Sequence, residues 1–333
     1  MPPSHLNLTE KAVIAVKKSL YEYLEKSLEY EEKERICRER NSYYKTDHDA
    51  TAMCLKEDYY SGLGSNMHAA YNVQLLISYG LIVSVYVSQD RSDTVTLGPA
   101  VRHFRDMYGY TPKRLIADAG YGSLSNYEFC DENGIRAFVK YGAWAGESSG
   151  RYPALYEYLD DGSITCLGNR KGYPVKIPGW HLRKKESLLF QVKNCERCEF
   201  MHYCSRLNQD REGPERYFEF NPRYAKLKQE ARDRLPSKEG IEMRINRSCQ
   251  VDGAFGVIKS NHSYDRFRRT RLERVRLEFK LNALGFNIRK FLEYAKLGAL
   301  PEYWSAPEDL EPDRFKKPSA KQIERRMNRI NKK

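Results

Sequence analysis

Two aspartates occupy positions at which a metal-dependent active site could form. Asp118 directly follows the short apolar run at 114–117, and ligands of α/β proteins bind at the carboxyl ends of strands. Asp252 precedes Lys259 by seven residues, a spacing that puts both side chains on one face of an α-helix, about 20° apart. Such an acid and base could hold a metal ion beside a phosphate. Taken singly, Asp118 could instead cap a turn, and the Asp252–Lys259 pair could be a solvated charged face.

Four cysteines form a second candidate site. They are Cys166, Cys195, Cys198 and Cys204, and His202 could replace one of them. Residues 145–222 are rich in glycine, proline and charge, so we expect too little apolar content there for folding by burial alone. Four thiolates suit a structural zinc ion, whose binding energy then contributes to folding. An iron–sulfur cluster and simple reduced thiols are the alternatives.

A cluster of arginines is the third candidate. Together with Lys259, the predicted DNA-binding residues are Arg266, Arg268, Arg269, Arg271, Arg274 and Arg276. Guanidinium groups suit phosphates, and the neighbouring Tyr264 and Phe267 could stack on an unpaired base. The alternative is a solvated helix face, because Glu273 and Glu278 interleave with the arginines. The basic tail after Lys316 is a weaker signal of the same kind.

The composition narrows the class of protein. The 333 residues include 57 Lys and Arg against 45 Asp and Glu, a net charge of +12. This surplus favours a polyanionic partner such as nucleic acid, although a generally basic soluble enzyme would look similar. The start of the chain lacks the pattern of a signal peptide, and polar residues interrupt the most apolar stretch, 71–87. The sequence therefore predicts a cytoplasmic protein with reduced cysteines and no membrane span.

The order of strand-like and helical segments around these residues predicts an α/β core built on a mixed sheet. A charged helix is expected at 9–40, with an apolar stripe suited to one neighbour, followed by an irregular connection at 41–64. The expected core elements are strands at 71–78, 81–87, 114–117 and 136–140 and helices at 94–108 and 127–133, with further helices over 224–298. We expect five parts: a helical arm (1–45), the first part of the core (46–144), a cysteine-rich insertion (145–222), a helical part of the core (223–298) and a basic tail (299–333).

Several motifs resemble one known family when they are taken together. They are DAGYGS at 118–123, QVDGAFGVIK at 250–259, KTDHDATAM at 45–53 and YNVQ at 71–74. In this combination the chain resembles the DDE transposases of insertion-sequence family 1182. Glu278, Asn287 and Lys290 continue the pattern, so the resemblance spans roughly residues 35–295.

The resemblance implies an RNase H-like core whose carboxylates hold two divalent ions, normally magnesium. These ions activate water or a 3′-hydroxyl for attack on a DNA phosphate. Asp118 matches the second catalytic aspartate of the family, and Asp252 stands where the family has a glutamate. The implied partners are double-stranded DNA at transposon ends and, in the complete enzyme, further copies of the same protein.

Two departures from the family pattern shape the functional hypothesis. Asp252 is one methylene shorter than glutamate, and a misplacement of about 1 Å can cost roughly 100-fold in rate. The first catalytic aspartate should precede the strands at 71–87, where Asp47 and Asp49 lie in a polar, irregular context. We therefore expect the carboxyl-terminal part of a longer transposase, lacking its first core strand and inactive alone. The alternative is a zinc-dependent nucleic-acid-binding protein without catalysis.

Overall fold

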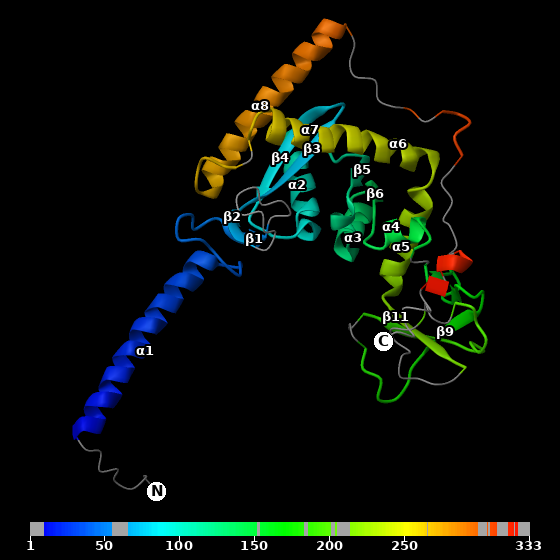
Figure 1. The fold of residues 1–333 in the computed structure, drawn as a ribbon, viewed down its shortest axis with the longest axis horizontal. Coiled ribbons are helices and arrows are strands. Elements are labelled where there is room, and N and C mark those ends of the chain that lie inside the picture. Colours follow the sequence, from blue (N-terminus) through cyan, green and yellow to red (C-terminus); the bar gives the residue numbers. More distant parts are fainter. Residues whose placement is uncertain are drawn as a thin grey trace. The chain divides into compact units, whose positions relative to one another are not determined.

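The chain forms a mixed α/β structure that divides into two compact units. The computed structural model describes residues 10–54, 66–151, 154–182, 186–200, 204, 214–264, 266–298, 305, 307–311, 319–322 and 324–325. Unit 1 comprises residues 1–74, 85–91 and 264–283, and unit 2 comprises residues 75–84, 92–263 and 284–333 (Figure 1). Within the described ranges, no helix combines the length and apolar character that crossing a membrane requires.

Unit 1 contains a short strand pair that the sequence does not predict. Strand β1 (Thr51–Cys54) pairs antiparallel with β2 (Met67–Ala70), so the expectation of an irregular connection over 41–64 was wrong at β1. A four-residue strand is too short to show the alternation by which strands are recognised. The segment just before β1 is fixed by Arg40, whose guanidinium donates to the carbonyls of His48 (2.7 Å) and Asp49 (2.8 Å).

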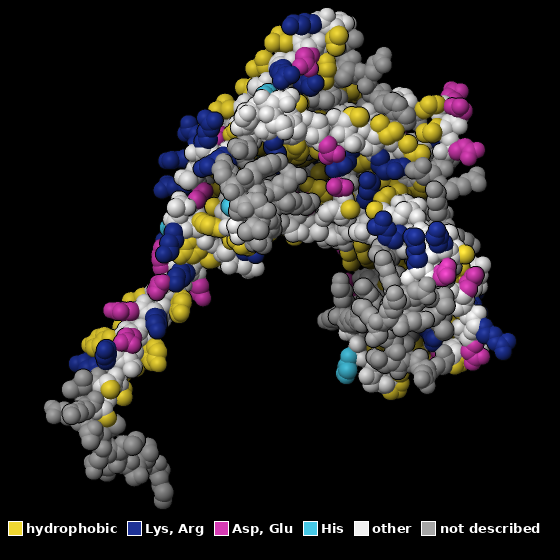
Figure 2. Space-filling view, viewed as in Figure 1, with side chains coloured by type: hydrophobic (Ala, Val, Ile, Leu, Met, Phe, Trp, Pro, Cys, Tyr) yellow, Lys and Arg dark blue, Asp and Glu magenta, His cyan; other side chains and the backbone are white. Residues whose placement is uncertain are grey.

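Helix α1 (Glu10–Cys37) confirms the long charged helix at the start of the chain. Its apolar stripe lies in solvent: Val13, Val16, Leu20, Leu24 and Leu28 are all about half exposed or more. Figure 2 shows hydrophobic side chains interspersed with charged ones along this helix. The stripe predicted to pack on one neighbour is therefore available for another partner.

The β3–β4 pair confirms the predicted hairpin. Strands β3 (Asn72–Ser78) and β4 (Leu81–Ser88) form a two-stranded sheet. The turn residues Tyr79 and Gly80 have φ values of 50° and 75°, and positive φ at both central residues is the geometry that favours tight hairpins. The tip of this hairpin belongs to unit 2 and its base to unit 1.

The core of unit 2 surrounds two parallel strands. Strand β5 (Arg114–Ala117) pairs in parallel with β6 (Arg136–Val139). Helices α2 (Leu97–Tyr108), α3 (Leu124–Glu132), α4 (Trp144–Ser148) and α5 (Pro222–Arg234) contribute further core residues. The strand–helix–strand order over 114–139 is thus confirmed, with Phe138 and Tyr141 among the most buried side chains.

The cysteine-rich part of unit 2 folds around its own core, contrary to expectation. An antiparallel sheet joins five consecutive strands: β7 (Tyr156–Tyr158), β8 (Ile164–Cys166), β9 (Lys171–Val175), β10 (Leu188–Val192) and β11 (Arg216–Phe220). Ile164, Phe190 and Phe218 are buried there together with Cys166 and Cys195. The prediction that this stretch could not fold by burial was wrong, because a few aromatic residues on short strands meet on one face.

A helix with two wider turns follows. Helix α6 (Lys238–Arg247) continues into a π-helical segment, η5 (Ser248–Asp252), then α7 (Gly253–Gly256) and a second π-helical segment, η6 (Val257–Asn261). Helix α8 (Leu272–Leu297) completes the predicted helical part of the chain. Asn287 on α8 fixes β4 through two hydrogen bonds of 2.8 Å, one to the N–H and one to the carbonyl of Ile82.

Candidate functional site

Asp118 lies at the carboxyl end of β5, as the sequence predicts. Its carbonyl accepts a hydrogen bond from the Tyr121 N–H (3.1 Å), which closes the short 3-10 turn η2 (Ala119–Tyr121). The turn is packed tightly: a Cβ on Gly122 would lie 2.7 Å from the Tyr141 Cα. Tyr224 on α5 donates to the Gly122 carbonyl (3.1 Å). The backbone that carries Asp118 is therefore held from two sides while its carboxylate points outward, 55% exposed.

Asp252 lies at the end of η5, on the exposed side of its helix. Ala254 and Ile258 are buried on the opposite side. The prediction that Asp252 and Lys259 share a face about 20° apart assumed regular α-helical turns. The two π-helical segments contradict that assumption, because a π turn contains more residues than an α turn. Lys259 instead lies beside Phe255, with its Nζ 5.9 Å from the ring centre.

Arg247 brings the two predicted catalytic aspartates together. Its Nη2 lies 3.5 Å from Asp118 Oδ2 and 3.5 Å from Asp252 Oδ1. The two carboxylate oxygens are therefore no more than twice that distance apart. The side chain of Arg247 is only 19% exposed. The two carboxylates therefore share a cation that is mostly buried beneath them.

Sequence reasoning did not assign a role to Arg247. One signal could have found it: two carboxylates that meet in one site repel each other, and a nearby cation lowers that energy. Asp93 is a second neighbour that was missed, because a Cβ on Gly120 would lie 3.2 Å from Asp93 Oδ2. Among the residues that the structure describes, no three acidic, histidine or cysteine side chains are arranged to hold a metal ion.

Asp47 and Asp49 hold backbone amides of the arginine segment in unit 1. Asp47 Oδ1 accepts the N–H of Arg271 (3.1 Å), and Asp49 Oδ2 accepts the N–H of Leu272 (3.0 Å), the first residue of α8. Asp47 also accepts the Tyr71 hydroxyl (2.7 Å). Burial and this bond raise the pKa of Tyr71 well above its usual value. These two aspartates therefore cap α8, where the helix dipole favours negative charge.

Glu278 holds the other end of the arginine segment. Its carboxylate oxygens accept the N–H groups of Arg268 and Arg269, both at 3.0 Å. Five arginine side chains in this segment are exposed to solvent: Arg266, Arg268, Arg269, Arg271 and Arg274. Arg276 differs, because it is half-buried and pairs with Glu273 at 2.6 Å. The segment thus presents five exposed guanidinium groups on a backbone fixed by carboxylates.

The aromatic rings of this segment pack against one another and against neighbouring rings of unit 1, and their stacking on an unpaired base stays a prediction. Phe267 contacts Tyr71, Tyr264 and Phe279, with ring centres 5.9–6.3 Å apart. Burial of these rings stabilises the loop. Contact with phosphates remains the chemistry that the segment offers.

The four predicted zinc ligands converge in unit 2. A small cavity of about 10 Å³ is lined by Cys166, Cys195, Cys198 and Cys204, together with Arg170 and Arg216. Burial raises the pKa of Cys204 to about 12 and also raises that of Cys195. The sheet therefore gathers the thiols around one space, although the described cysteines do not have the arrangement of a metal site. His202 lies outside the described residues.

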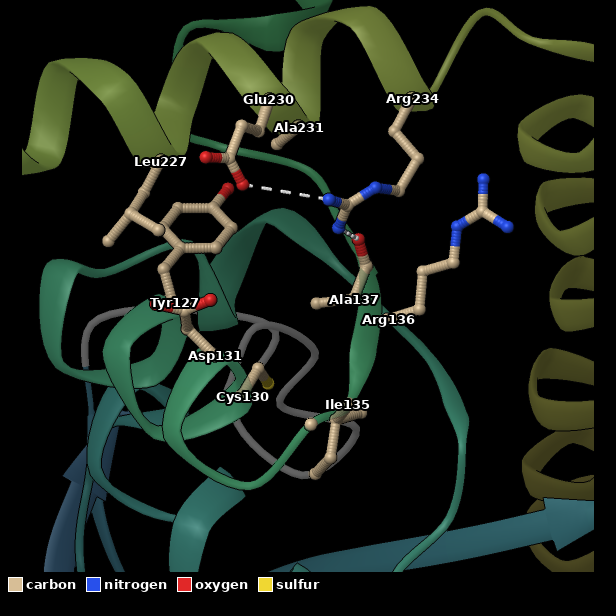
Figure 3. A pocket seen from close by; sticks show the side chains of 11 residues that line it. Tyr127, Cys130, Asp131, Ile135, Arg136, Ala137, Leu227, Glu230, Ala231 and Arg234 are labelled. Atoms are coloured by element: carbon tan, nitrogen blue, oxygen red, sulfur yellow. Dashed lines mark hydrogen bonds and ion pairs between the residues drawn. The ribbon is translucent and has the colours of Figure 1, made fainter.

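A larger, open cavity elsewhere in unit 2 has an ion pair in its lining (Figure 3). It has a volume of about 290 Å³ and lies between α3, β6 and α5. Arg234 donates to the Ala137 carbonyl (3.0 Å) and pairs with Glu230 (3.6 Å). Asp131, also in its lining, pairs with Arg223 at 2.6 Å. The charged groups of the lining are thus paired with one another or with neighbouring residues.

Comparison with known proteins gives one match. Residues 169–292 match the family model described as "Transposase DDE domain". This match supports a DDE transposase. It includes Asp252, Lys259 and the arginine segment and begins after Asp118, and the mixed α/β architecture is consistent with a DDE domain. No curated protein and no solved structure matches the chain.

The position of Arg247 between Asp118 and Asp252 leads to a prediction about metal affinity. The variant Arg247→Gln should bind Mn²⁺, a spectroscopic substitute for Mg²⁺, roughly fivefold more tightly, because a partly exposed ion pair is worth up to about 1 kcal/mol. Electron paramagnetic resonance titration of free Mn²⁺ measures this. Arg223→Gln, which breaks the remote pair with Asp131, is the control. Weaker binding by Arg247→Gln would show that Arg247 positions the carboxylates for the metal.

Proposed function

We propose that the chain is a DDE transposase polypeptide, which acts in the metal-dependent cleavage and strand transfer of DNA on an RNase H-like core. The cluster of Asp118, Arg247 and Asp252 carries this proposal, because it joins two carboxylates from distant segments at the end of a core strand. The family match over 169–292 supports it independently. The proposed substrate is double-stranded DNA at the ends of an insertion sequence.

The donor atoms of this cluster fit Mg²⁺. Asp118 and Asp252 both offer carboxylate oxygens, which are the ligands that Mg²⁺ prefers, and both already face one cationic group. These two residues would hold the ion. When bound, Mg²⁺ would activate a water or 3′-hydroxyl nucleophile and stabilise the leaving oxygen. Arg247 would limit the repulsion between the carboxylates before the ion arrives.

The cluster contributes two carboxylates, whereas the family resemblance implies three. Asp47 and Asp49 are engaged with backbone amides of the arginine segment in unit 1, and Asp252 is shorter than the expected glutamate. We therefore propose that the cluster binds a divalent ion and that the chain neither cleaves nor joins DNA by itself.

Substitution of the two aspartates tests this function. Asp118→Asn and Asp252→Asn should each weaken Mn²⁺ binding about tenfold or more, because a coordinating charge is removed, whereas Asp131→Asn should not. In a nicking assay with Mg²⁺ or Mn²⁺, we expect no activity from the chain or from Asp252→Glu. Nicking abolished by Asp47→Ala or Asp49→Ala would contradict this and would identify the third carboxylate. Mn²⁺ binding unchanged in both Asn variants would favour the noncatalytic zinc-dependent alternative.

The arginine segment is the proposed main contact with the DNA backbone. Its exposed side chains suit phosphates. The backbone N–H groups of Arg268 and Arg269 donate to Glu278, so substitution of these two side chains should leave the loop conformation intact. Lys259, exposed on η6, is proposed as an additional contact.

Charge reversal at Arg268 and Arg269 tests this surface. The double variant should weaken duplex binding for every sequence tested and should reduce the slope of log affinity against log salt by about 0.9 for each phosphate that is no longer bound. Fluorescence anisotropy at several salt concentrations measures both quantities, with Lys226→Glu on α5 as the control. A larger loss of affinity on deletion of the tail after Lys316 would show that the main DNA surface lies elsewhere.

We also propose that the four converging cysteines bind one structural zinc ion. The shared cavity supports this proposal. Burial favours the thiol form of Cys195, and the two arginines in the lining act against this effect by stabilising the thiolate. Zinc binding releases thiol protons, so the affinity should increase with pH.

Elemental analysis of the purified chain tests the zinc site. We expect about one zinc per chain, falling towards zero when Cys166, Cys195, Cys198 or Cys204 is changed to Ser. Cys249→Ser, which alters an exposed cysteine on η5, should retain the metal. Iron with the absorption of an iron–sulfur cluster would replace zinc as the explanation, and unchanged metal content in all four variants would contradict the site.

A homo-oligomeric transposase is the proposed working form. The exposed apolar stripe on α1 supports this proposal, because a run of half-exposed Val and Leu side chains along one helix favours association.

A further inference from the structure

We propose that the outer face of strands β9 and β10, in the cysteine-rich part of unit 2, binds an unpaired DNA strand. The face carries three cations and an exposed tyrosine around an open hollow of about 540 Å³. The residues that line this hollow are Arg170, Lys171, Tyr173, Val175, Gln191, Lys193 and Asn194. None of these described lining residues is acidic.

The sheet register places Lys171, Tyr173 and Gln191 on one face. Tyr173 on β9 lies opposite Gln191 on β10, and Gly172 lies opposite Val192. A Cβ on Gly172 would lie only 2.6 Å from Val192 Cγ2 and 2.8 Å from a side-chain carbon of Ile164, so the Gly172 side faces the core. Side chains alternate along a strand. Lys171 and Tyr173 must therefore face outward.

The charge on this face favours a polyanion. Arg170, Lys171 and Lys193 surround the hollow. Two carboxylates lie nearby: Asp161 is 3.8 Å from Lys171, and Glu215 accepts hydrogen bonds from Gln191 and the Tyr217 hydroxyl. The lining nonetheless has a surplus of cations that suits phosphates.

Tyr173 distinguishes an unpaired strand from a duplex. Its side chain is 57% exposed in the middle of this basic face. A flat aromatic ring stacks on a base only when that base is free of its partner, and such stacking tolerates any sequence. The side-chain carbonyl of Gln191, whose amide nitrogen is engaged with Glu215 and Tyr217, and the amide of Asn194 add groups that can hydrogen-bond to base edges.

Arg170 is fixed by the thiol cluster behind it. Its backbone N–H donates to Cys166 Sγ at 3.4 Å. Its guanidinium interacts with Cys198. The cysteines therefore hold one cation of the hollow in place, which reduces the entropy lost when a phosphate binds.

The identity of the anion as DNA rests on the proposed transposase function, but the test needs no catalysis. The full chain is titrated with a fluorescent single-stranded oligonucleotide, without divalent metal. A second oligonucleotide carrying 5-iodouracil is then photocrosslinked, and the crosslinked peptide is mapped. We expect crosslinking to the segment between Lys171 and Lys176 and competition by unlabelled single strands.

Two substitutions make this outcome specific. Tyr173→Leu should remove the crosslink and weaken single-strand binding roughly fivefold, with duplex affinity changed less than twofold. Lys193→Gln should weaken single-strand binding and lower its salt slope by about 0.7. The matched controls are Tyr110→Leu, at an equally exposed tyrosine of unit 2, and Lys226→Gln.

Several results would overturn the proposal. One is an oligonucleotide that binds but crosslinks only outside the segment between Lys171 and Lys176. Another is a reduction in single-strand affinity that is equal in the variants and in their controls. A duplex that competes for the Tyr173 crosslink as well as a single strand would also overturn it. Failure of the metal-binding test at Asp118 and Asp252 would leave these readouts unchanged, so the two proposals can fail separately.

Discussion

Repulsion between like charges is the constraint on which the candidate site depends. Asp118 and Asp252 are separated by more than a hundred residues, yet both carboxylates lie within ion-pair distance of one Arg247 nitrogen. That arrangement requires the end of β5 and the long helix that begins at α6 to meet. The close approach of Gly122 to the backbone just after β6 and the hydrogen bond from Tyr224 favour this meeting, because they fix the turn that follows Asp118.

Carboxylates in unit 1 have a different role, because they accept hydrogen bonds from the backbone of a basic loop. Asp47, Asp49 and Glu278 accept four backbone N–H groups from the arginine segment. Because the acids are bound to amides rather than to guanidinium groups, they fix the loop without neutralising the arginine side chains directly. The segment can therefore be both ordered and strongly basic. A loop held by arginine–carboxylate pairs would lose much of its attraction for phosphate.

The sequence predicted those parts whose signals are local. The hairpin turn at Tyr79 and Gly80, the strand before Asp118 and the long helices have residue preferences or periodicities that act over a few neighbours. The remainder depends on tertiary contacts. Arg247 acquires its role only when two distant carboxylates meet, the π-helical turns that reorient Lys259 have no simple sequence pattern, and the strands of the cysteine-rich sheet are only three to five residues long.

The independent core of that sheet changes what a metal could contribute to it. On sequence alone, zinc was expected to fold a segment that lacked apolar residues. Ile164, Phe190 and Phe218 already supply a buried core, and burial of such side chains is worth roughly 1.5–3 kcal/mol each. A metal on the four thiols would therefore act mainly on the loops that carry Cys195 and Cys198 and on Arg170 beside them. In that case the thiol cluster would fix the charged surface of the sheet and would not be the source of its fold.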